Sequence, residues 1–262
     1  MTPKVLSIAG SDPSGGAGIQ ADLKTFSALG VYGMSVITAL TAQNTKGVSA
    51  VEMVAPEFLR AQLEAIFDDI AVHAIKIGMI GTAENAHVIA DILEKYKPSN
   101  VVLDPVMVAT SGDSLVSNDA VEAIKTRLIP LADVITPNIS EAEKLSRKAV
   151  LDMERAAKDL IPLGAKAVFL KGGHLKGEEA IDVLATPSSL EIFSAPRVLT
   201  SNTHGTGCTL SSAIAARLAH GDSLAEACGA AKAYLTGALK AGDTLGVGHG
   251  NGPVHHFWET WS

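Results

Sequence analysis

Short, almost continuously apolar runs alternate along the chain with segments of helical periodicity. The runs lie at residues 5–10, 35–40, 74–79, 101–106, 133–138 and 167–173. They are rich in β-branched residues and lack a polar alternate face, which is typical of strands buried on both sides of a parallel sheet. We therefore expect six such strands.

The intervening segments repeat apolar side chains every three or four residues, which predicts amphipathic helices at 56–70, 83–96, 119–128 and 153–163. Ser223 and Glu226 have the spacing of a capping box and open a further helix that continues through Ala233 or beyond. Residues 181–194 predict a hairpin around the turn 186–189. This alternation indicates an α/β fold with a mostly parallel sheet flanked by helices, in a single domain over residues 1–262.

In sheets of this kind, ligands bind beyond the carboxyl ends of the strands. The polar and glycine-rich sequences of this chain follow the apolar runs directly: GSDPSGGAG, TAQNT, GMIGT, DPVM, TPNISE and KGGH. Candidate site residues are therefore sought among them.

Composition narrows the function classes. The chain is 47% hydrophobic and 19% charged, with a net charge of −7, so it can bury a large core. No basic cluster indicates nucleic-acid binding, and no apolar run reaches the roughly 18 residues of a membrane span. The two cysteines cannot form a disulfide framework. We expect a cytoplasmic protein without nucleic-acid or membrane partners.

The glycine-rich turn after the first run has two interpretations. Gly16 and Gly18 fit a loose dinucleotide fingerprint, which alone is a weak signal. A nicotinamide enzyme needs an acid about 20 residues on, at the end of the second strand. That strand runs into Gln43 and Asn44 instead. Glycines that let a small ligand approach the backbone are favoured over both the fingerprint and a simple tight turn.

Two acids follow strands and could hold a cation. Asp104 comes in DPVM and Glu141 in TPNISE. A pair of carboxylates with nucleotide phosphates and water is the usual setting of Mg²⁺. Glu141 has an equally good interpretation as an N-terminal acid that meets a helix dipole.

The stretch NTHGTGC, before a small-residue helix, is the strongest motif. Gly205, Thr206 and Gly207 would leave amide N–H groups free at a helix N-terminus, an anion site suited to a moving phosphoryl group. The same field should lower the pKa of Cys208 and make it a usable base. The alternative is a small buried cysteine beside glycines. Lys171, at the end of an apolar run, should meet phosphate or an acid.

Taken together and in order, AGSDPSGGAGIQADLKTFSALG, TALTAQNT, KIGMIG, LDPVM, ITPN-x-x-E, KGGH, NTHGTGC and GHGNGPVHH resemble the hydroxymethylpyrimidine/phosphomethylpyrimidine kinases of thiamine synthesis. These enzymes are part of the ribokinase-like superfamily. The resemblance covers nearly the whole chain.

The resemblance implies a homodimeric kinase that uses ATP and Mg²⁺. Its substrates would be 4-amino-5-hydroxymethyl-2-methylpyrimidine and the monophosphate formed from it. Pyridoxal or pyridoxine kinases of vitamin B6 salvage are the nearest alternative, because their substrates also carry a hydroxymethyl group on a nitrogen heterocycle. A non-catalytic pyrimidine sensor is disfavoured because the motif residues are all present.

The resemblance also implies roles for individual residues. Cys208 would be the base, and Gly205, Thr206 and Gly207 the anion hole. Asp104 and Glu141 would surround Mg²⁺, partly through water. The groups expected on the phosphate side are Lys171, Asn138 and Thr203. The groups expected around the pyrimidine are Gln43 as the principal side chain, with Gly10, Asp22, Met79 and Val106.

Overall fold

The central strands of the sheet run parallel and come from the apolar segments of the sequence. The computed structural model describes residues 1–107, 117–173, 175 and 177–261. Its parallel strands are β1 (Lys4–Ser11), β2 (Tyr32–Asn44), β4 (Ala74–Ile77), β5 (Val101–Leu103), β6 (Val134–Ile135) and β7 (Val168–Lys171). All six predicted strands are confirmed, although β6 has only two residues.

Antiparallel strands extend the sheet at both ends. β3 (Gly47–Met53) pairs with β2, while β8 (Glu179–Ala185) and β9 (Leu190–Pro196) follow β7. The strand order is β3-β2-β1-β4-β5-β6-β7-β8-β9. The predicted hairpin is confirmed as β8–β9, and the Thr186 amide closes its turn onto the Ser189 carbonyl at 3.0 Å. β3 was not predicted, because its side chains are mostly exposed and carry no apolar pattern.

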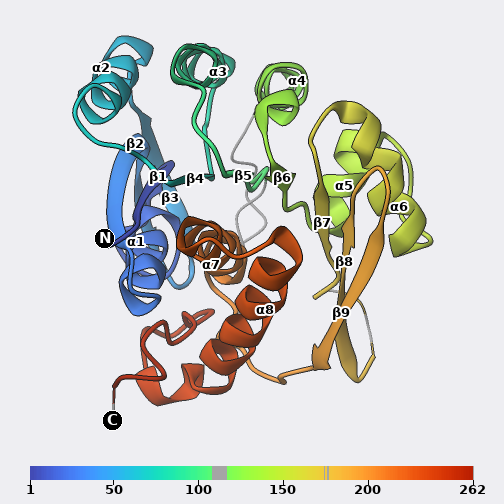
Figure 1. Cartoon of the computed structure of the whole chain (residues 1–262). Coiled ribbons are helices and arrows are strands. Elements are labelled where there is room, and N and C mark those ends of the chain that lie inside the picture. The colour runs from blue at the N-terminus through green and yellow to red at the C-terminus, as the bar shows by residue number, and fades with distance from the viewer. Residues whose placement is uncertain (108–116, 174, 176, 262) are drawn as a thin grey trace.

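Helices cover both faces of this sheet (Figure 1). One face carries α2 (Pro56–Phe67), α3 (Ala83–Tyr96), α4 (Asn118–Ala123), α5 (Ile139–Ser146) and α6 (Met153–Leu160). The opposite face carries α1 (Gly18–Ala28), α7 (Thr206–His220) and α8 (Leu224–Lys240). In the described ranges, no helix is long and apolar enough to cross a bilayer.

The predicted helices are present with altered ends. The helix expected at 119–128 is α only to Ala123 and continues as a π-helical turn, Ile124–Leu128. α2 ends at Phe67, and α6 gives way to a 3-10 turn, Ile161–Leu163, which has a proline in its first turn. The capping box of Ser223 and Glu226 is confirmed at the start of α8.

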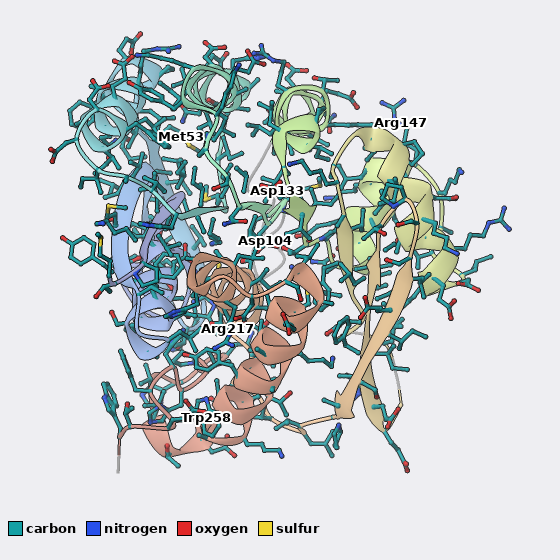
Figure 2. All side chains as sticks on the ribbon, in the orientation of Figure 1. Met53, Asp104, Asp133, Arg147, Arg217 and Trp258 are labelled. Carbon is teal, nitrogen blue, oxygen red and sulfur yellow. The ribbon has the colours of Figure 1, made fainter. Side chains whose placement is uncertain are left out.

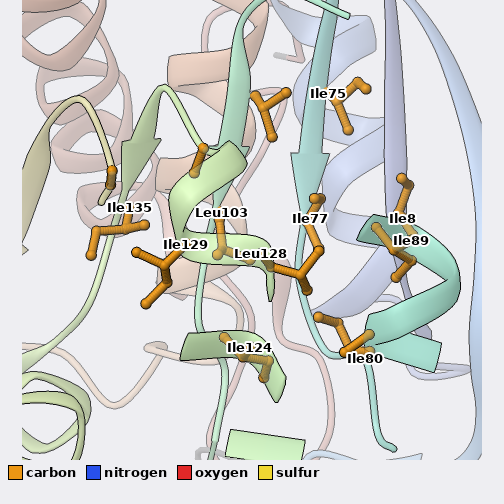
Figure 3. Packing of buried hydrophobic residues seen from close by; sticks show 14 of the residues in the cluster. Ile8, Ile75, Ile77, Ile80, Ile89, Leu103, Ile124, Leu128, Ile129 and Ile135 are labelled. Atoms are coloured by element: carbon orange, nitrogen blue, oxygen red, sulfur yellow. The ribbon is translucent and has the colours of Figure 1, made fainter. Parts of the chain in front are cut away.

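The core on the α3 face is built from branched aliphatic side chains (Figure 3). Ile8, Ile77 and Leu103 project from neighbouring strands and meet Ile89 and Leu128 from the covering helices. These side chains are at most 1% exposed. Burial of this apolar surface stabilises the sheet. Because the side chains are closely packed, the strands and their carboxyl ends are held in fixed positions.

Candidate active site

A cleft of about 790 Å³ opens at the carboxyl ends of the parallel strands. Thirteen of the fourteen predicted site residues line it: Gly10, Gln43, Met79, Asp104, Val106, Asn138, Glu141, Lys171, Thr203, Gly205, Thr206, Gly207 and Cys208. Asp104 lies centrally in the molecule (Figure 2). Its Oδ2 is 3.5 Å from a Cβ built at Gly207, in the first turn of α7. The fold therefore brings together motifs that are separated by up to about 200 residues in the sequence.

Asp22 is the exception and requires a correction. It is fully buried in α1 and does not line the cleft. Its carboxylate accepts hydrogen bonds from Ser7 (2.6 Å) and Ser212 (2.7 Å) and pairs with the Lys76 ammonium at 2.8 Å. A carboxylate saturated in this way is committed to the protein interior. The structure therefore pairs Asp22 with Lys76 and does not bring it to the cleft lining, where the expected contact with the pyrimidine would lie.

The predicted anion site lies at the start of α7. Gly205 caps the helix with φ +80°, and a Cβ built there would come within 1.8 Å of the Gly16 carbonyl oxygen. Only glycine fits, because the first glycine-rich loop packs directly onto this turn. The Thr206 amide donates to the Thr203 carbonyl at 3.3 Å, and the next first-turn amides follow at Gly207 and Cys208. Such amides and the helix dipole attract an anion.

The environment of Cys208 contradicts the predicted thiol activation. Burial raises the pKa of this thiol to about 11, and the carboxylates of Asp22 and Asp104 act in the same direction. The Lys76 ammonium and a hydrogen bond from the Gly18 amide favour the thiolate but do not outweigh burial. The helix dipole can be read from the sequence, whereas the partial burial of Cys208 in the cleft wall cannot.

Asp104 and Lys171 form an ion pair at the floor of the cleft. The Lys171 ammonium donates to Asp104 Oδ1 at 2.7 Å, and the Thr136 hydroxyl donates to the same oxygen at 2.9 Å. Burial lowers the Lys171 pKa, but the carboxylates of Asp104 and Glu141 raise it above its ordinary value. Lys171 therefore stays charged and can form an ion pair with Asp104. Gly207 lies next to this pair: a Cβ built on it would be 3.4 Å from Lys171 Nζ.

Glu141 satisfies both of its interpretations. It forms a capping box with Asn138: the Glu141 amide donates to Asn138 Oδ1 at 2.9 Å, and the Asn138 amide donates to Glu141 Oε2 at 2.7 Å. It also lines the cleft beside Asp104. Burial raises the pKa of Glu141 to about 7, Asp104 adds to the rise and Lys171 opposes it.

The donor set of the cleft suits Mg²⁺ better than a metal held by protein alone. Within the part of the chain that the structure describes, no three His, Cys, Asp or Glu side chains are grouped as a metal cage requires. Asp104 and Glu141 offer hard carboxylate oxygens, and the described contacts of Asp104 both fall on Oδ1. Mg²⁺ typically takes one or two carboxylates and completes its shell with water and phosphate oxygens, so the residues present fit this ion.

The sequence reasoning missed Asp12 and His204, which form a buried pair in the wall of the cleft. His204 Nε2 lies 2.7 Å from Asp12 Oδ2, and Gln43 Nε2 lies 3.5 Å from the same imidazole nitrogen. Burial raises the Asp12 pKa, but hydrogen bonds, from His204 first, outweigh it and bring the pKa down to about 2. The sequence does contain an indication of Asp12, because this acid closely follows an apolar strand, as Asp104 does.

Comparisons with known proteins identify the family of this chain. The model of the phosphomethylpyrimidine kinase family matches residues 12–255. A hydroxymethylpyrimidine/phosphomethylpyrimidine kinase from Rhizobium meliloti is 56% identical over 100% of this chain and 99% of its own. The crystal structure of phosphomethylpyrimidine kinase from Clostridium difficile is 48% identical with a TM-score of 0.82, over 91% of this chain and 100% of that one.

A more distant relative shares the fold as closely. Pyridoxal kinase from Staphylococcus aureus, in complex with AMP-PCP and pyridoxal, has a TM-score of 0.90 at 35% identity and covers 99% of this chain and 95% of its own. The fold is thus the ribokinase-like fold that both kinds of kinase share. With a family model that matches nearly the whole sequence and relatives above 45% identity, this chain belongs to the phosphomethylpyrimidine kinase family.

Proposed function

We propose that this kinase transfers a phosphoryl group from ATP to the hydroxymethyl group of 4-amino-5-hydroxymethyl-2-methylpyrimidine, and a second one to the resulting monophosphate, for thiamine biosynthesis. The observation that carries the proposal is the 56% identity, over the full length of both chains, to a kinase named for these two substrates. The cleft supports the proposal, because the acidic, basic, thiol and amide side chains of the sequence motifs all line it.

The phosphates of ATP would lie between the Asp104–Lys171 pair and the start of α7. Lys171 supplies the positive charge, with Asn138 and Thr203 as polar neighbours. Mg²⁺, held by Asp104 and Glu141 partly through water, would neutralise phosphate charge. The solved relative bound to AMP-PCP supports the use of a nucleoside triphosphate by this fold.

The pyrimidine would lie at the opposite end of the cleft, against Gln43. An amide side chain offers a donor and an acceptor, which matches a ring nitrogen and the neighbouring amino group of an aminopyrimidine. Gly10, Met79 and Val106 line the same cleft. A Cβ at Gly10 would come within 3.0 Å of Met79 Sδ, so glycine leaves that space to the ring.

In the transfer step, the hydroxymethyl oxygen attacks the γ-phosphorus in line with the leaving oxygen of ADP. One P–O bond forms as the other breaks, and the amides of Gly207 and Cys208 meet the charge on the moving group. The hydroxyl proton passes to the Cys208 thiolate late in the step. Because burial keeps this thiol protonated at neutral pH, only a small thiolate fraction is competent at any moment.

Pyridoxal phosphorylation is the second candidate, favoured by the TM-score of 0.90 to a pyridoxal kinase. The deciding experiment measures ATP consumption with hydroxymethylpyrimidine, its monophosphate and pyridoxal at equal concentrations. We expect turnover of both pyrimidines and little of pyridoxal. Turnover mainly of pyridoxal would transfer the protein to vitamin B6 salvage, and turnover of none would refute the substrate assignment.

Two substitutions separate the chemical and the binding roles. Cys208→Ala should reduce kcat at least about 100-fold while ATP still binds, because a base contributes about 10² to 10⁴ in rate. Gln43→Ala should raise the pyrimidine KM about tenfold or more and leave the ATP KM unchanged. A Cys208→Ala variant with normal kcat would remove the base assignment, and an unchanged pyrimidine KM would remove Gln43 from the ring site.

We also propose that the protein is a cytoplasmic homodimer. The support for an association surface is β3, whose Val51 (38%) and Met53 (36%) side chains are exposed at one edge of the sheet. Apolar side chains on an unpaired edge strand favour pairing with another chain.

A further inference from the structure

A fully buried ion pair lies behind the cleft and has no part in the proposed transfer step. Lys76, on β4, points its ammonium at both oxygens of Asp22, each at 2.8 Å. Ser7 and Ser212 complete the hydrogen bonds of that carboxylate. All four residues are inaccessible to solvent. Burying a lysine and an aspartate costs several kcal/mol in lost hydration, so hydrophobic residues would hold this core at least as well.

The ion pair meets α7 about one helical turn from Cys208. The Ser212 hydroxyl on α7 donates to Asp22 on α1 at 2.7 Å. Cys208 and Ser212 are four residues apart on α7. One turn advances about 5.4 Å along a helix, so Asp22 contacts α7 one turn after the thiol.

The charges that face the thiol come from several elements packed around it. They are the Lys76 ammonium on β4, the Asp22 carboxylate on α1, the Asp104 carboxylate after β5 and the Lys171 ammonium at the end of β7. Lys171 is already neutralised by Asp104. Lys76 is the cation that most strongly opposes the burial-driven rise in the Cys208 pKa, and Asp22 works against it.

We propose that Lys76 is a positioning residue for phosphoryl transfer: its buried ammonium, anchored by Asp22, stabilises the Cys208 thiolate from the protein interior. Asp22 holds the ammonium in place and limits its effect. The proposal rests on Cys208 as the base of the proposed function. It gives these two fully buried charges a role that a hydrophobic pair could not supply.

The test measures how fast iodoacetamide alkylates Cys208 as a function of pH, in Lys76→Met, Asp22→Asn and wild-type protein, by mass spectrometry of the Cys208 peptide. Removing the cation should raise the apparent pKa of Cys208 by about one unit and slow alkylation about tenfold at a fixed pH. Removing the anion should shift both in the opposite direction. Loss of packing would instead expose the thiol and accelerate both variants.

Cys228 provides an internal folding control, because it is fully buried and becomes reactive only when the core opens. The double variant Lys76→Met/Asp22→Asn removes both charges, so it avoids an unpaired buried ion. It should alkylate within about threefold of wild type. If Lys76→Met does not fold, the other two variants still test the proposal. Asp22→Asn should lower the Cys208 pKa, and the double variant should leave it near the wild-type value.

Equal alkylation rates in all variants, or shifts of the same sign in both single variants, would overturn the proposal. The pH profile of kcat should follow the alkylation profile in each variant, which a merely structural role would not produce. The assay also separates this proposal from the proposed function. Retained turnover in Cys208→Ala refutes the base role, whereas an alkylation rate insensitive to Lys76 refutes the charge link.

Discussion

At the scale of single residues, the chemistry of the cleft depends on how burial competes with nearby charge. Cys208 lies at a helix N-terminus, yet burial raises its pKa to about 11. Glu141 caps a helix, yet its pKa rises to about 7. In both groups, the loss of hydration outweighs a favourable helix dipole, whose effect is typically below about 2 kcal/mol.

The raised thiol pKa predicts a pH dependence of the transfer step. Below its pKa, the thiolate fraction increases about tenfold for each pH unit, so single-turnover phosphorylation should accelerate by that factor between about pH 7 and 9. Cys208→Ala should flatten the profile as well as lower it. Rapid-quench measurements provide the rates, and a slope that survives in Cys208→Ala would assign the titration to another group.

Glu141→Gln tests the acidic group of the capping box. The pKa rises from 4.5 unfolded to about 7 folded, so ionisation opposes folding, and this cost develops between those values and is fully present above about pH 7. Glutamine keeps the cap without the charge, so the variant should be more stable at pH 8 by on the order of 1 kcal/mol. It should also need more Mg²⁺ for activity. Urea unfolding at pH 8 and a Mg²⁺ titration check both expectations.

At the scale of elements, the glycines at the two ends of α7 have different roles. Gly205 at the N-terminus and Gly221 at the C-terminus both have positive φ. An added Cβ would clash with Gly16 at Gly205, whereas it meets nothing within 4 Å at Gly221. The first glycine therefore joins two parts of the cleft, while the second only ends a helix.

Gly205→Ala and Gly221→Ala form a matched pair. Gly221→Ala should lose about 1 kcal/mol of stability through backbone strain, and Gly205→Ala should lose more, because its Cβ also clashes with the Gly16 carbonyl oxygen. Only Gly205→Ala should also lose turnover, by about 100-fold or more, because it separates the glycine-rich loop from the anion site. Thermal unfolding and kcat/KM measure the two effects. Equal kcat/KM in the two variants would contradict the assigned anion site.

The elements themselves show which features a sequence can reveal. β1, β2 and β4–β7 are readable because strands buried on both faces must be apolar throughout. β3 and the exact helix ends are not, because exposed edges and proline-bounded turns depend on tertiary packing. The role of Lys76 also depends on tertiary packing. It lies inside the apolar run 74–79, and its partner Asp22 is distant in the sequence. The convergence of the cleft residues was predictable from their position after strands, whereas their protonation was not.

At the scale of the whole molecule, the sheet has two open edges, β3 and β9 (Figure 1). Each exposes a branched apolar side chain, Val51 at 38% and Ile192 at 54%. If β3 forms the proposed homodimer contact, Val51→Lys should give a monomer in sedimentation velocity at micromolar concentration, and Ile192→Lys should leave the dimer intact. The reverse result would move the contact to β9, and a monomeric wild type would exclude the dimer.

The central claim is that one cleft performs two successive phosphorylations, and product stoichiometry tests it most directly. Hydroxymethylpyrimidine should be incubated with excess ATP and Mg²⁺, and ADP should be counted for each pyrimidine consumed at completion. We expect about two ADP per pyrimidine and a diphosphate product detected by ³¹P NMR. Cys208→Ala should form neither product, because without the base no monophosphate is made for the second transfer. About one ADP per pyrimidine, with the monophosphate as end product, would contradict it.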